Sequence, residues 1–339
     1  MEQTYTPKLD YKVLVRCFTY NQSKYIEDAL NGFAMQKTNF PFACLVMDDC
    51  STDGEQEVIK SWMERECDME KAEYVDLELS KVILVPHKSN DNCTFAFYLL
   101  KQNLYGTGKK MPLVTPWREH CQYEAMCEGD DYWIIDDKLQ KQVDALDNNQ
   151  QVTMVYTDYQ TVDESGTPFI RPQYEKYKEL HMSGDNLPNL FKTNYPLTCT
   201  AMVRREVVKS DIYKNAPVKL DYALFMSAAF MGNFVYIDKQ TSCYRQNPKS
   251  LMNAQHSLVE KCSKELGRYF SITYARGLSK IEPLFKDLLI KYHISKKYVS
   301  HIPEHKPIFK EICKYNKSFY WFVPIVWIVK TFEKITFQR

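Results

Sequence analysis

Three carboxylates and a glycine stand together in Glu128-Gly129-Asp130-Asp131, directly after the apolar run 123–127. Carboxylates this dense at the end of a predicted strand repel one another unless a cation or a hydrogen-bonded ligand neutralises them. A solvated turn is the alternative, because Asp and Gly are ordinary turn residues. The aromatic pair Tyr132-Trp133 favours packing, which would leave the carboxylates partly desolvated. The pattern therefore predicts a site for a metal-bound phosphate.

A second acidic pair, Asp48-Asp49, follows the apolar run 42–47. A carboxylate there can accept a hydrogen bond from a nucleobase imide or a ribose hydroxyl, although one of the pair can instead serve as a cap. The next residues, Ser51-Thr52-Asp53-Gly54, are standard capping chemistry at the start of a helix. The pair therefore indicates a nucleotide contact less strongly than the first cluster does.

Two further residues have both a chemical and a structural interpretation. Asp221 precedes an apolar helix, so it is either the N-cap or a base that deprotonates an acceptor hydroxyl. Arg245, in Tyr244-Arg245-Gln246-Asn247, either contacts phosphate or forms a surface ion pair. Spacing alone favours the cap for Asp221 and does not decide for Arg245.

Alternating strands and helices must position these groups. The pattern predicts a strand over 11–18, a helix from an N-cap at Ser23, a strand over 42–47, a helix over 55–63 and a strand over 81–86. This order predicts an α/β fold with a mostly parallel central sheet and helices on both faces. Ligands of such sheets bind beyond the carboxyl ends of the strands. We therefore expect 19–21, 48–49 and 128–131 to converge on one edge.

The rest of the chain is less regular until its last third. Residues 92–120 and 168–188 are expected to be an insertion or mobile loop and an irregular excursion, respectively. Further elements are predicted as helices over 139–146 and 222–230, strands over 153–157, 197–203 and 233–237, a turn over 163–166, and a helical region from about 251.

Composition excludes several classes of protein. Among 339 residues, 44 basic and 43 acidic side chains leave a net charge of +1, so no global field favours nucleic acid or an anionic membrane. Eleven cysteines show no CxxC pair and no signal peptide precedes them, which indicates reduced thiols in a cytoplasmic protein. Motifs of dinucleotide oxidoreductases, P-loop enzymes, serine hydrolases and zinc proteases do not occur.

An apolar run near the carboxyl terminus, residues 319–329, is interrupted by Pro324 and is too short to span a bilayer, which takes about 20 residues. Tryptophan and tyrosine with basic flanks suit an anchor at the inner face of the membrane. A buried helix or a contact between copies of the chain is the alternative. The flanking basic residues are Lys314, Lys317, Lys330, Lys334 and Arg339.

Five ordered motifs give the chain a family resemblance. It resembles the inverting glycosyltransferases of family 2, of the kind that bacteria use for surface polysaccharides, from about Tyr11 to Ser250. The motifs are Thr19-Tyr20-Asn21-Gln22-Ser23-Lys24-Tyr25-Ile26, Met35-Gln36-Lys37-Thr38, Asp48-Asp49-Cys50-Ser51-Thr52-Asp53-Gly54, the stretch 128–133 and Lys138-Leu139-Gln140-Lys141-Gln142-Val143.

The resemblance implies a GT-A fold over residues 1–250. Residues up to about 133 would form the nucleotide-sugar half and residues 134–250 the acceptor half, followed by a helical region at 251–339. A hexosyltransferase-like enzyme of this family takes a nucleotide-diphosphate sugar as donor, Mg²⁺ or Mn²⁺ as cofactor, and a glycan or lipid-linked acceptor. The alternative is a non-catalytic nucleotide-sugar-binding or assembly protein with the same fold.

Site residues also follow from the resemblance. Tyr20 would pack on the nucleobase and Asp49 would recognise it. Asp130 and Asp131 would hold the cation and the diphosphate, and Glu128 would contact the ribose or support them. Asp221 matches the catalytic base of the family, which reverses the preference for a cap. Many members have a histidine where this chain has Asn247, which leaves a third metal ligand open.

Overall fold

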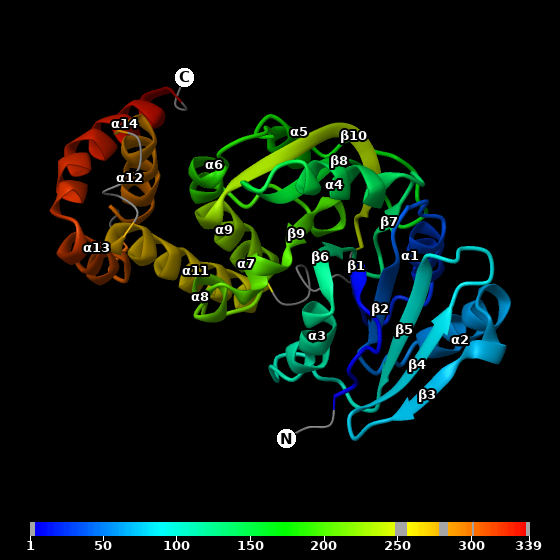
Figure 1. The fold of residues 1–339 in the computed structure, drawn as a ribbon. Helices are drawn as coiled ribbons and strands as arrows, with labels where there is room; N and C mark the ends of the chain where they lie inside the picture. Colours follow the sequence, from blue (N-terminus) through cyan, green and yellow to red (C-terminus); the bar gives the residue numbers. More distant parts are fainter. Residues whose placement is uncertain (1–3, 248–255, 278–283, 300–301, 337–339) are drawn as a thin grey trace. The chain divides into compact units, whose positions relative to one another are not determined.

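The computed structural model describes residues 4–247, 256–277, 284–299 and 302–336 (Figure 1). The chain divides into two compact units. The first contains the sheet and comprises Met1–Gly184, Tyr195–Lys209 and Met231–Ser250. The second is helical and comprises Asp185–Asn194, Ser210–Phe230 and Leu251–Arg339. The helical region predicted after 250 therefore packs with two earlier segments of the chain.

Among the described residues, ten strands form a sheet in the order β3-β4-β5-β2-β1-β6-β9-β8-β10-β7 (Figure 1). The four neighbouring strands β5, β2, β1 and β6 are parallel, and antiparallel pairs flank them. The strands are β1 Tyr11–Thr19, β2 Phe42–Asp48, β3 Glu73–Asp76, β4 Ser80–Pro86, β5 Cys93–Leu100, β6 Cys121–Met126, β7 Tyr132–Trp133, β8 Val152–Val162, β9 Met202–Arg204 and β10 Asn233–Arg245.

Helices cover both faces of this sheet, as predicted for the α/β class. Alternate side chains of β1 and β2 enter two separate cores because successive residues of a strand point to opposite faces. One core includes Leu30, Trp62 and Leu139 from α1, α2 and α4, and the other includes Trp117 from α3. The helices of this unit are α1 Ile26–Ala34, α2 Glu55–Glu66, α3 Lys110–Glu119, α4 Lys138–Asp147, α5 Pro172–Lys178 and α7 Arg205–Lys209, with 3₁₀ turns η1 Met69–Lys71 and η2 Thr198–Thr200.

The prediction of a loop over 92–120 is wrong. This stretch contains β5, which pairs in parallel with β2 in the sheet, and α3, which covers one face. Every side chain of β5 except Thr94 is buried, so the strand has no polar alternation to reveal it. The glycines at 106 and 108 mark only the short connection to α3, where both have positive φ.

Smaller differences concern the ends of elements. The first helix begins at Ile26 rather than after Ser23, and the Ser23 amide donates to the Asp53 carboxylate (3.0 Å) of the next loop. The strands predicted over 153–157 and 233–237 extend to Val162 and Arg245, and the excursion after 168 includes α5. All eleven cysteines are free, and nine are buried as expected for structural thiols.

The helical unit is built on long helices, whose buried side chains include Phe270, Ile294, Ile312 and Val326. Within the described ranges, no helix is long and apolar enough to cross a membrane. The elements of this unit are α6 Leu187–Lys192, α8 Asp211–Lys214, α9 Asp221–Met231, α11 His256–Arg276, α12 Leu284–Tyr298, α13 His305–Tyr315, η4 Lys317–Trp321 and α14 Phe322–Thr336.

Candidate active site

The three predicted stretches do converge at one edge of the sheet. Thr19 at the end of β1 pairs with Asp48 at the end of β2, and the Asp49 amide donates to the Thr19 carbonyl (3.0 Å). On the other side of β1, the Gly129 amide donates to the Phe18 carbonyl (3.2 Å). The loops after β1, β2 and β6 therefore meet beyond the carboxyl ends of parallel strands.

Gly129 is required by the close approach of two of these loops. A Cβ atom at this position would lie 2.3 Å from Thr19 Oγ1 and 2.5 Å from Gln22 Oε1. These distances are shorter than van der Waals contact, so no side chain fits without moving the loop after β1. The acidic loop therefore lies directly against residues 19–22.

Glu55, the first residue of α2, joins the loops after β1 and β2. Its buried carboxylate accepts hydrogen bonds from the Gln22 amide (2.8 Å), the Ser51 hydroxyl (2.8 Å) and the Thr19 hydroxyl. Burial raises the pKa of Glu55 to about 7. Sequence analysis missed this residue because Ser51-Thr52-Asp53-Gly54 explains the start of a helix without it.

Tyr20 lies at the tip of the first loop, where its side chain is 46% exposed. The neighbouring Asn21 has a φ of 56°, in the left-handed region, and its side-chain oxygen accepts from the Thr52 amide (2.8 Å). The Asn21 amide in turn donates to the Ser51 hydroxyl (2.8 Å). The loop is thus fixed to its neighbour while the aromatic ring of Tyr20 remains in solvent.

The carboxylate of Asp49 already has partners in the protein. Its two oxygens accept from the Leu104 amide (2.6 Å) and pair with the Lys110 ammonium (2.5 Å). Asp48 accepts from the Ser51 amide (3.2 Å) and from Gln56, and its other oxygen is buried without a hydrogen-bond partner among the described residues. Both carboxylates thus help to hold the β2 end, which sequence alone left open.

Two arginines neutralise Glu124 inside strand β6. Arg16 Nε lies 2.9 Å from one oxygen of this carboxylate, and Arg118 donates to both oxygens at 2.6 and 2.9 Å. Burial alone would raise the pKa of Glu124, but the two guanidinium groups lower it to about 2. This buried charge is therefore balanced within the sheet unit.

Glu128 connects this cluster to the acidic loop. One of its oxygens accepts from the Phe18 amide (3.2 Å), and the other lies 3.5 Å from Arg16. Desolvation raises the pKa of Glu128, and the Arg16 charge offsets this only in part. The carboxylate is thus turned toward β1, which suits a supporting role better than that of a metal ligand.

Asp130 and Asp131 have fewer compensating contacts. Asp131 is 2% exposed and accepts from the Arg245 amide (2.9 Å), while the partly exposed Asp130 accepts from the Asn247 side chain (3.5 Å). Burial raises the pKa of both carboxyl groups, and the charge of Asp130 raises that of Asp131 further. A cation beside them would relieve this cost.

The donor set at this place fits a divalent cation that is shared with a phosphate. Within the described ranges, no group of three or more His, Cys, Asp or Glu residues is arranged to hold a metal ion. Mg²⁺ is often held by only one or two carboxylates together with substrate phosphates and water. Asp130 and Asp131 supply such carboxylates, and the structure places the side-chain nitrogen of Asn247 against Asp130, where it donates.

Arg245 forms an ion pair rather than facing solvent. Its guanidinium lies 2.7 Å from the Asp28 carboxylate, and its side chain is only 3% exposed. The same group lies over the rings of Tyr25 and Tyr132, at 4.6 and 5.1 Å from their centroids. The side chain thus fastens β10 to α1, while the backbone of the same residue holds Asp131.

Gln36, from the motif at 35–38, orders the chain beyond the acidic loop. Its side-chain nitrogen donates to the carbonyls of Gly32 (3.0 Å) and Ile135 (2.7 Å), and its oxygen accepts from the Leu139 amide (3.1 Å). These bonds join the end of α1 to the start of α4. The motif thus supports the site without facing it.

Asp221 is the first residue of α9 and belongs to the helical unit. Its carboxylate accepts from the Tyr222 amide (2.7 Å) and from the Asn194 side chain (3.1 Å). An N-cap side chain accepts from the second or third helical amide, so this bond to the next residue is not the cap contact expected from spacing. Its role as a base therefore stays a prediction.

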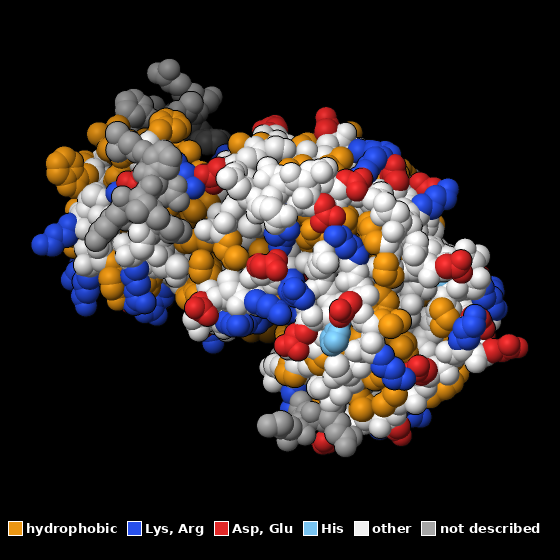
Figure 2. Space-filling model, viewed as in Figure 1, with side chains coloured by type: hydrophobic (Ala, Val, Ile, Leu, Met, Phe, Trp, Pro, Cys, Tyr) orange, Lys and Arg blue, Asp and Glu red, His pale blue; other side chains and the backbone are white. Residues whose placement is uncertain are grey.

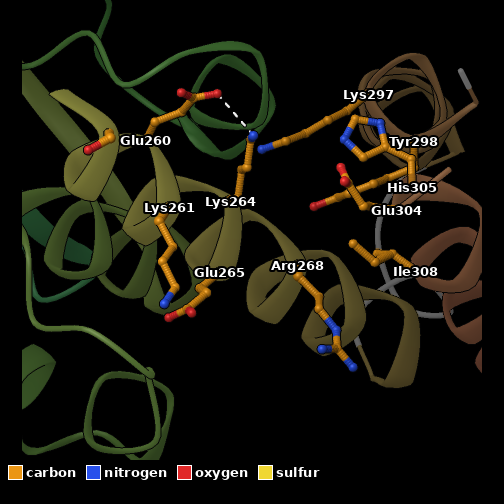
Figure 3. Close-up of a pocket in the computed structure, with 11 residues that line it drawn as sticks. Glu260, Lys261, Lys264, Glu265, Arg268, Lys297, Tyr298, Glu304, His305 and Ile308 are labelled. Carbon is orange, nitrogen blue, oxygen red and sulfur yellow. Dashed lines mark ion pairs between the residues drawn. The ribbon is translucent and has the colours of Figure 1, made fainter. Parts of the chain in front are cut away.

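A hollow of about 440 Å³ lies within the helical unit (Figure 3). Side chains from α11, the end of α12 and the start of α13 point into it, with Lys264 paired to Glu260 at 3.0 Å. Both basic and acidic groups line it, and none of the predicted site residues is among the described residues that do so.

The site just described is an acidic loop at the carboxyl ends of parallel strands in an α/β sheet. Residues 17–83 match the model of the family described as "Glycosyl transferase family 2". Over 240 residues, 70% of this chain, the sequence is 26% identical to "Uncharacterized protein Rv1520" of Mycobacterium tuberculosis and to "Uncharacterized protein Mb1547" of Mycobacterium bovis. The match spans 60% of the length of these relatives.

Two solved structures are also similar over most of the chain. S. aureus TarS 1-349 in complex with UDP-GlcNAc is 16% identical, with 93% of this chain and 90% of that chain covered and a TM-score of 0.49. The mannosyltransferase PcManGT from Pyrobaculum calidifontis, in complex with GDP-Man and Mn²⁺, is 15% identical, with 96% and 76% covered and a TM-score of 0.47.

Proposed function

We propose that this chain is an inverting, hexosyltransferase-like glycosyltransferase of GT-A fold. It moves a sugar from a nucleotide-diphosphate sugar to a hydroxyl of a glycan or lipid-linked acceptor in surface polysaccharide synthesis. The observation that carries the proposal is the acidic loop, where Asp130 and Asp131 have raised pKa values at the junction of three strand-end loops. The family match over residues 17–83 covers two of these loops and supports the same function.

The donor would lie along this edge of the sheet. The exposed ring of Tyr20 can stack on the nucleobase, because its loop is held by Asn21 and Glu55 rather than by packing of the ring. Asp49 can accept from the base only through lone pairs that Leu104 and Lys110 leave free. Glu128 would support the ribose side of the site.

The diphosphate would lie at the acidic loop. A bound Mg²⁺ or Mn²⁺ would supply charge neutralisation for the leaving nucleotide diphosphate. Asp130 and Asp131 would hold it, with Asp131 oriented by the Arg245 amide and Asp130 by Asn247. These bonds fix both carboxylates before the donor arrives, which is the pre-organisation that transition-state stabilisation requires.

Asp221 is the proposed base, which takes the proton of the acceptor hydroxyl as its oxygen attacks the anomeric carbon. One displacement from the face opposite the leaving diphosphate inverts the configuration.

We expect Asp221→Asn to lower turnover by roughly 10²–10⁴-fold, the usual contribution of a general base, while donor binding is retained. Asp211→Asn is the matched control, because Asp211 is also the first residue of a helix in the same unit. Turnover measured as released nucleotide that is unchanged in Asp221→Asn would remove this residue from the mechanism.

A non-catalytic nucleotide-sugar-binding or assembly protein is the second candidate. The observation in its favour is that the carboxylates of Asp49 and Asp131 accept hydrogen bonds from backbone amides, so they also serve to hold the fold together. Titration with UDP-sugars and GDP-sugars in the presence and absence of Mn²⁺, followed by an assay for released nucleotide, separates the two. Binding without release on any donor and acceptor would support the second candidate and contradict the first.

A further inference from the structure

The outer face of η4 and α14 is apolar and lies in solvent. Trp321, Ile325 and Ile328 are 78%, 46% and 56% exposed, and their spacing of four and three residues places them on one side of the helix. Phe322 and Val326, on the other side, are buried in the core of the helical unit. The segment is therefore apolar on both sides, and only one side has a partner within the described residues.

A row of lysines lies on the preceding helix. Lys306, Lys310 and Lys314 recur every four residues along α13, and all three are exposed. No ion pair joins these three lysines to any acidic group among the residues that the structure describes. The single acidic residue of α13, Glu311, pairs with Arg268 at 2.7 Å. We call these three residues the lysine row.

The apolar face and the lysine row belong to adjoining elements. α13 contacts η4, and η4 contacts α14. Figure 2 shows hydrophobic side chains gathered over the part of the unit that Figure 1 labels α14, and lysine and arginine side chains over the part labelled α13. Residues 305–321 contain four lysines and one glutamate, so this surface is basic although the whole chain is nearly neutral.

The basic flank predicted from sequence is partly different in the structure. The Lys330 ammonium donates to the Val299 carbonyl (2.7 Å), so it caps α12 rather than extending the charged surface. Lys317 on η4 is exposed next to Trp321. The side chain of Lys334 and the whole of Arg339 lie outside what the structure describes.

Two occupants could cover an exposed apolar face of this kind. In a symmetric dimer the same patch meets itself, so the lysine row would come close to its copy and like charges would oppose association. An anionic lipid surface matches both parts, because tryptophan and isoleucine enter the interfacial region and lysines attract lipid phosphate. Since α14 has 15 residues and about 20 are needed to span, it would lie in the interface.

We propose that η4, α14 and the lysine row dock this chain on an anionic membrane surface without crossing it. The inference goes beyond sugar transfer and does not rest on it. It also identifies which lysines attract the lipid, namely those of α13 rather than Lys330, which lies within α14.

The test is flotation of the full chain with lipid vesicles of two compositions, phosphatidylcholine alone and phosphatidylcholine mixed with phosphatidylglycerol. We expect binding to the mixed vesicles only. Replacing Lys306, Lys310 and Lys314 together by Gln should weaken this binding by roughly a hundredfold, since each lysine near an anionic surface contributes about fivefold. The matched control replaces the exposed lysines Lys60, Lys81 and Lys209 by Gln, which changes the net charge equally and should leave binding unchanged.

A second variant tests the apolar contribution. Trp321→Ser combined with Ile328→Ser removes exposed side chains, so the thermal unfolding temperature should be unchanged while vesicle binding falls by about tenfold or more. Equal binding to both vesicle compositions, or no binding to either, would overturn the proposal. The proposal would also be overturned if the chain dimerises, Trp321→Ser abolishes the dimer, and the chain binds neither kind of vesicle. Nucleotide titration of the same variants should be unaffected, which separates a failure here from a failure of the glycosyltransferase proposal.

Discussion

The buried carboxylates of strand β6 and of the loop that follows it differ in their partners. Within the strand, Glu124 is enclosed by Arg16 and Arg118, and its pKa falls to about 2. A few residues later, Asp130 and Asp131 have no guanidinium or ammonium group in hydrogen-bond contact among the described residues, and their pKa values are raised. The sheet unit thus pairs one acidic group with two guanidinium groups and leaves the charge of two others only partly compensated.

This difference locates the negative charge that the proposed cation would neutralise. Arginines are present near the loop, but Arg16 points to Glu124 and Glu128, and Arg245 points to Asp28. Each guanidinium is therefore committed to another carboxylate. An external cation is the group that would complete the loop, just as the arginines complete the strand.

The largest effect is expected from removing the charge of Glu124, the carboxylate that two arginines balance. Glu124→Gln leaves Arg16 and Arg118 buried without their carboxylate, which should reduce the free energy of unfolding by about 3–5 kcal/mol. Glu73→Gln is the control, because its ion pair with Lys8 is exposed to solvent and should contribute little to stability. Urea denaturation of both variants measures the difference. Equal losses would show that the Glu124 cluster is no more important than a surface ion pair.

A smaller effect concerns Glu55, whose protonation couples the site loops to pH. Burial raises its pKa from 4.5 to about 7, so in this range the folded chain holds a proton that the unfolded chain has released. The contribution of Glu55 to stability is therefore complete below pH 4.5 and is lost as the pH rises through about 7. As the pH rises across this window, the free energy of unfolding of Glu55→Gln should increase relative to that of wild type by up to about 1.4 kcal/mol per pH unit. Urea denaturation at several pH values measures it, and a difference that does not change with pH would show that Glu55 is ionised throughout.

Sequence patterns predicted the convergence of the loops because it follows from general rules. Strands that alternate with helices give a parallel sheet, and the ends of parallel strands meet at one edge. The acidic loop, Tyr20 and the first two strands were therefore located correctly. These conclusions depend on local sequence and need no knowledge of distant contacts.

The contacts that sequence did not reveal are distant ones. Leu104 and Lys110 reach Asp49 from a connection that was predicted to be a loop, and Arg16 and Arg118 meet Glu124 from two separate elements. Nothing in the local pattern around Asp49 or Glu124 identifies these partners. Strand β5 was missed for a related reason, because a strand buried on both faces lacks polar alternation.

The proposed function requires the acidic loop to bind a cation and a nucleotide diphosphate together. The most direct measurement is the thermal unfolding of wild type, Asp130→Asn and the exposed control Asp136→Asn with UDP or GDP, in Mn²⁺ and in EDTA. Wild type and the control should be stabilised only when nucleotide and Mn²⁺ are both present, by about 2.7 kcal/mol at 100 times the dissociation constant. Asp130→Asn should lose this gain. Equal stabilisation in EDTA, or a full gain in Asp130→Asn, would contradict the account.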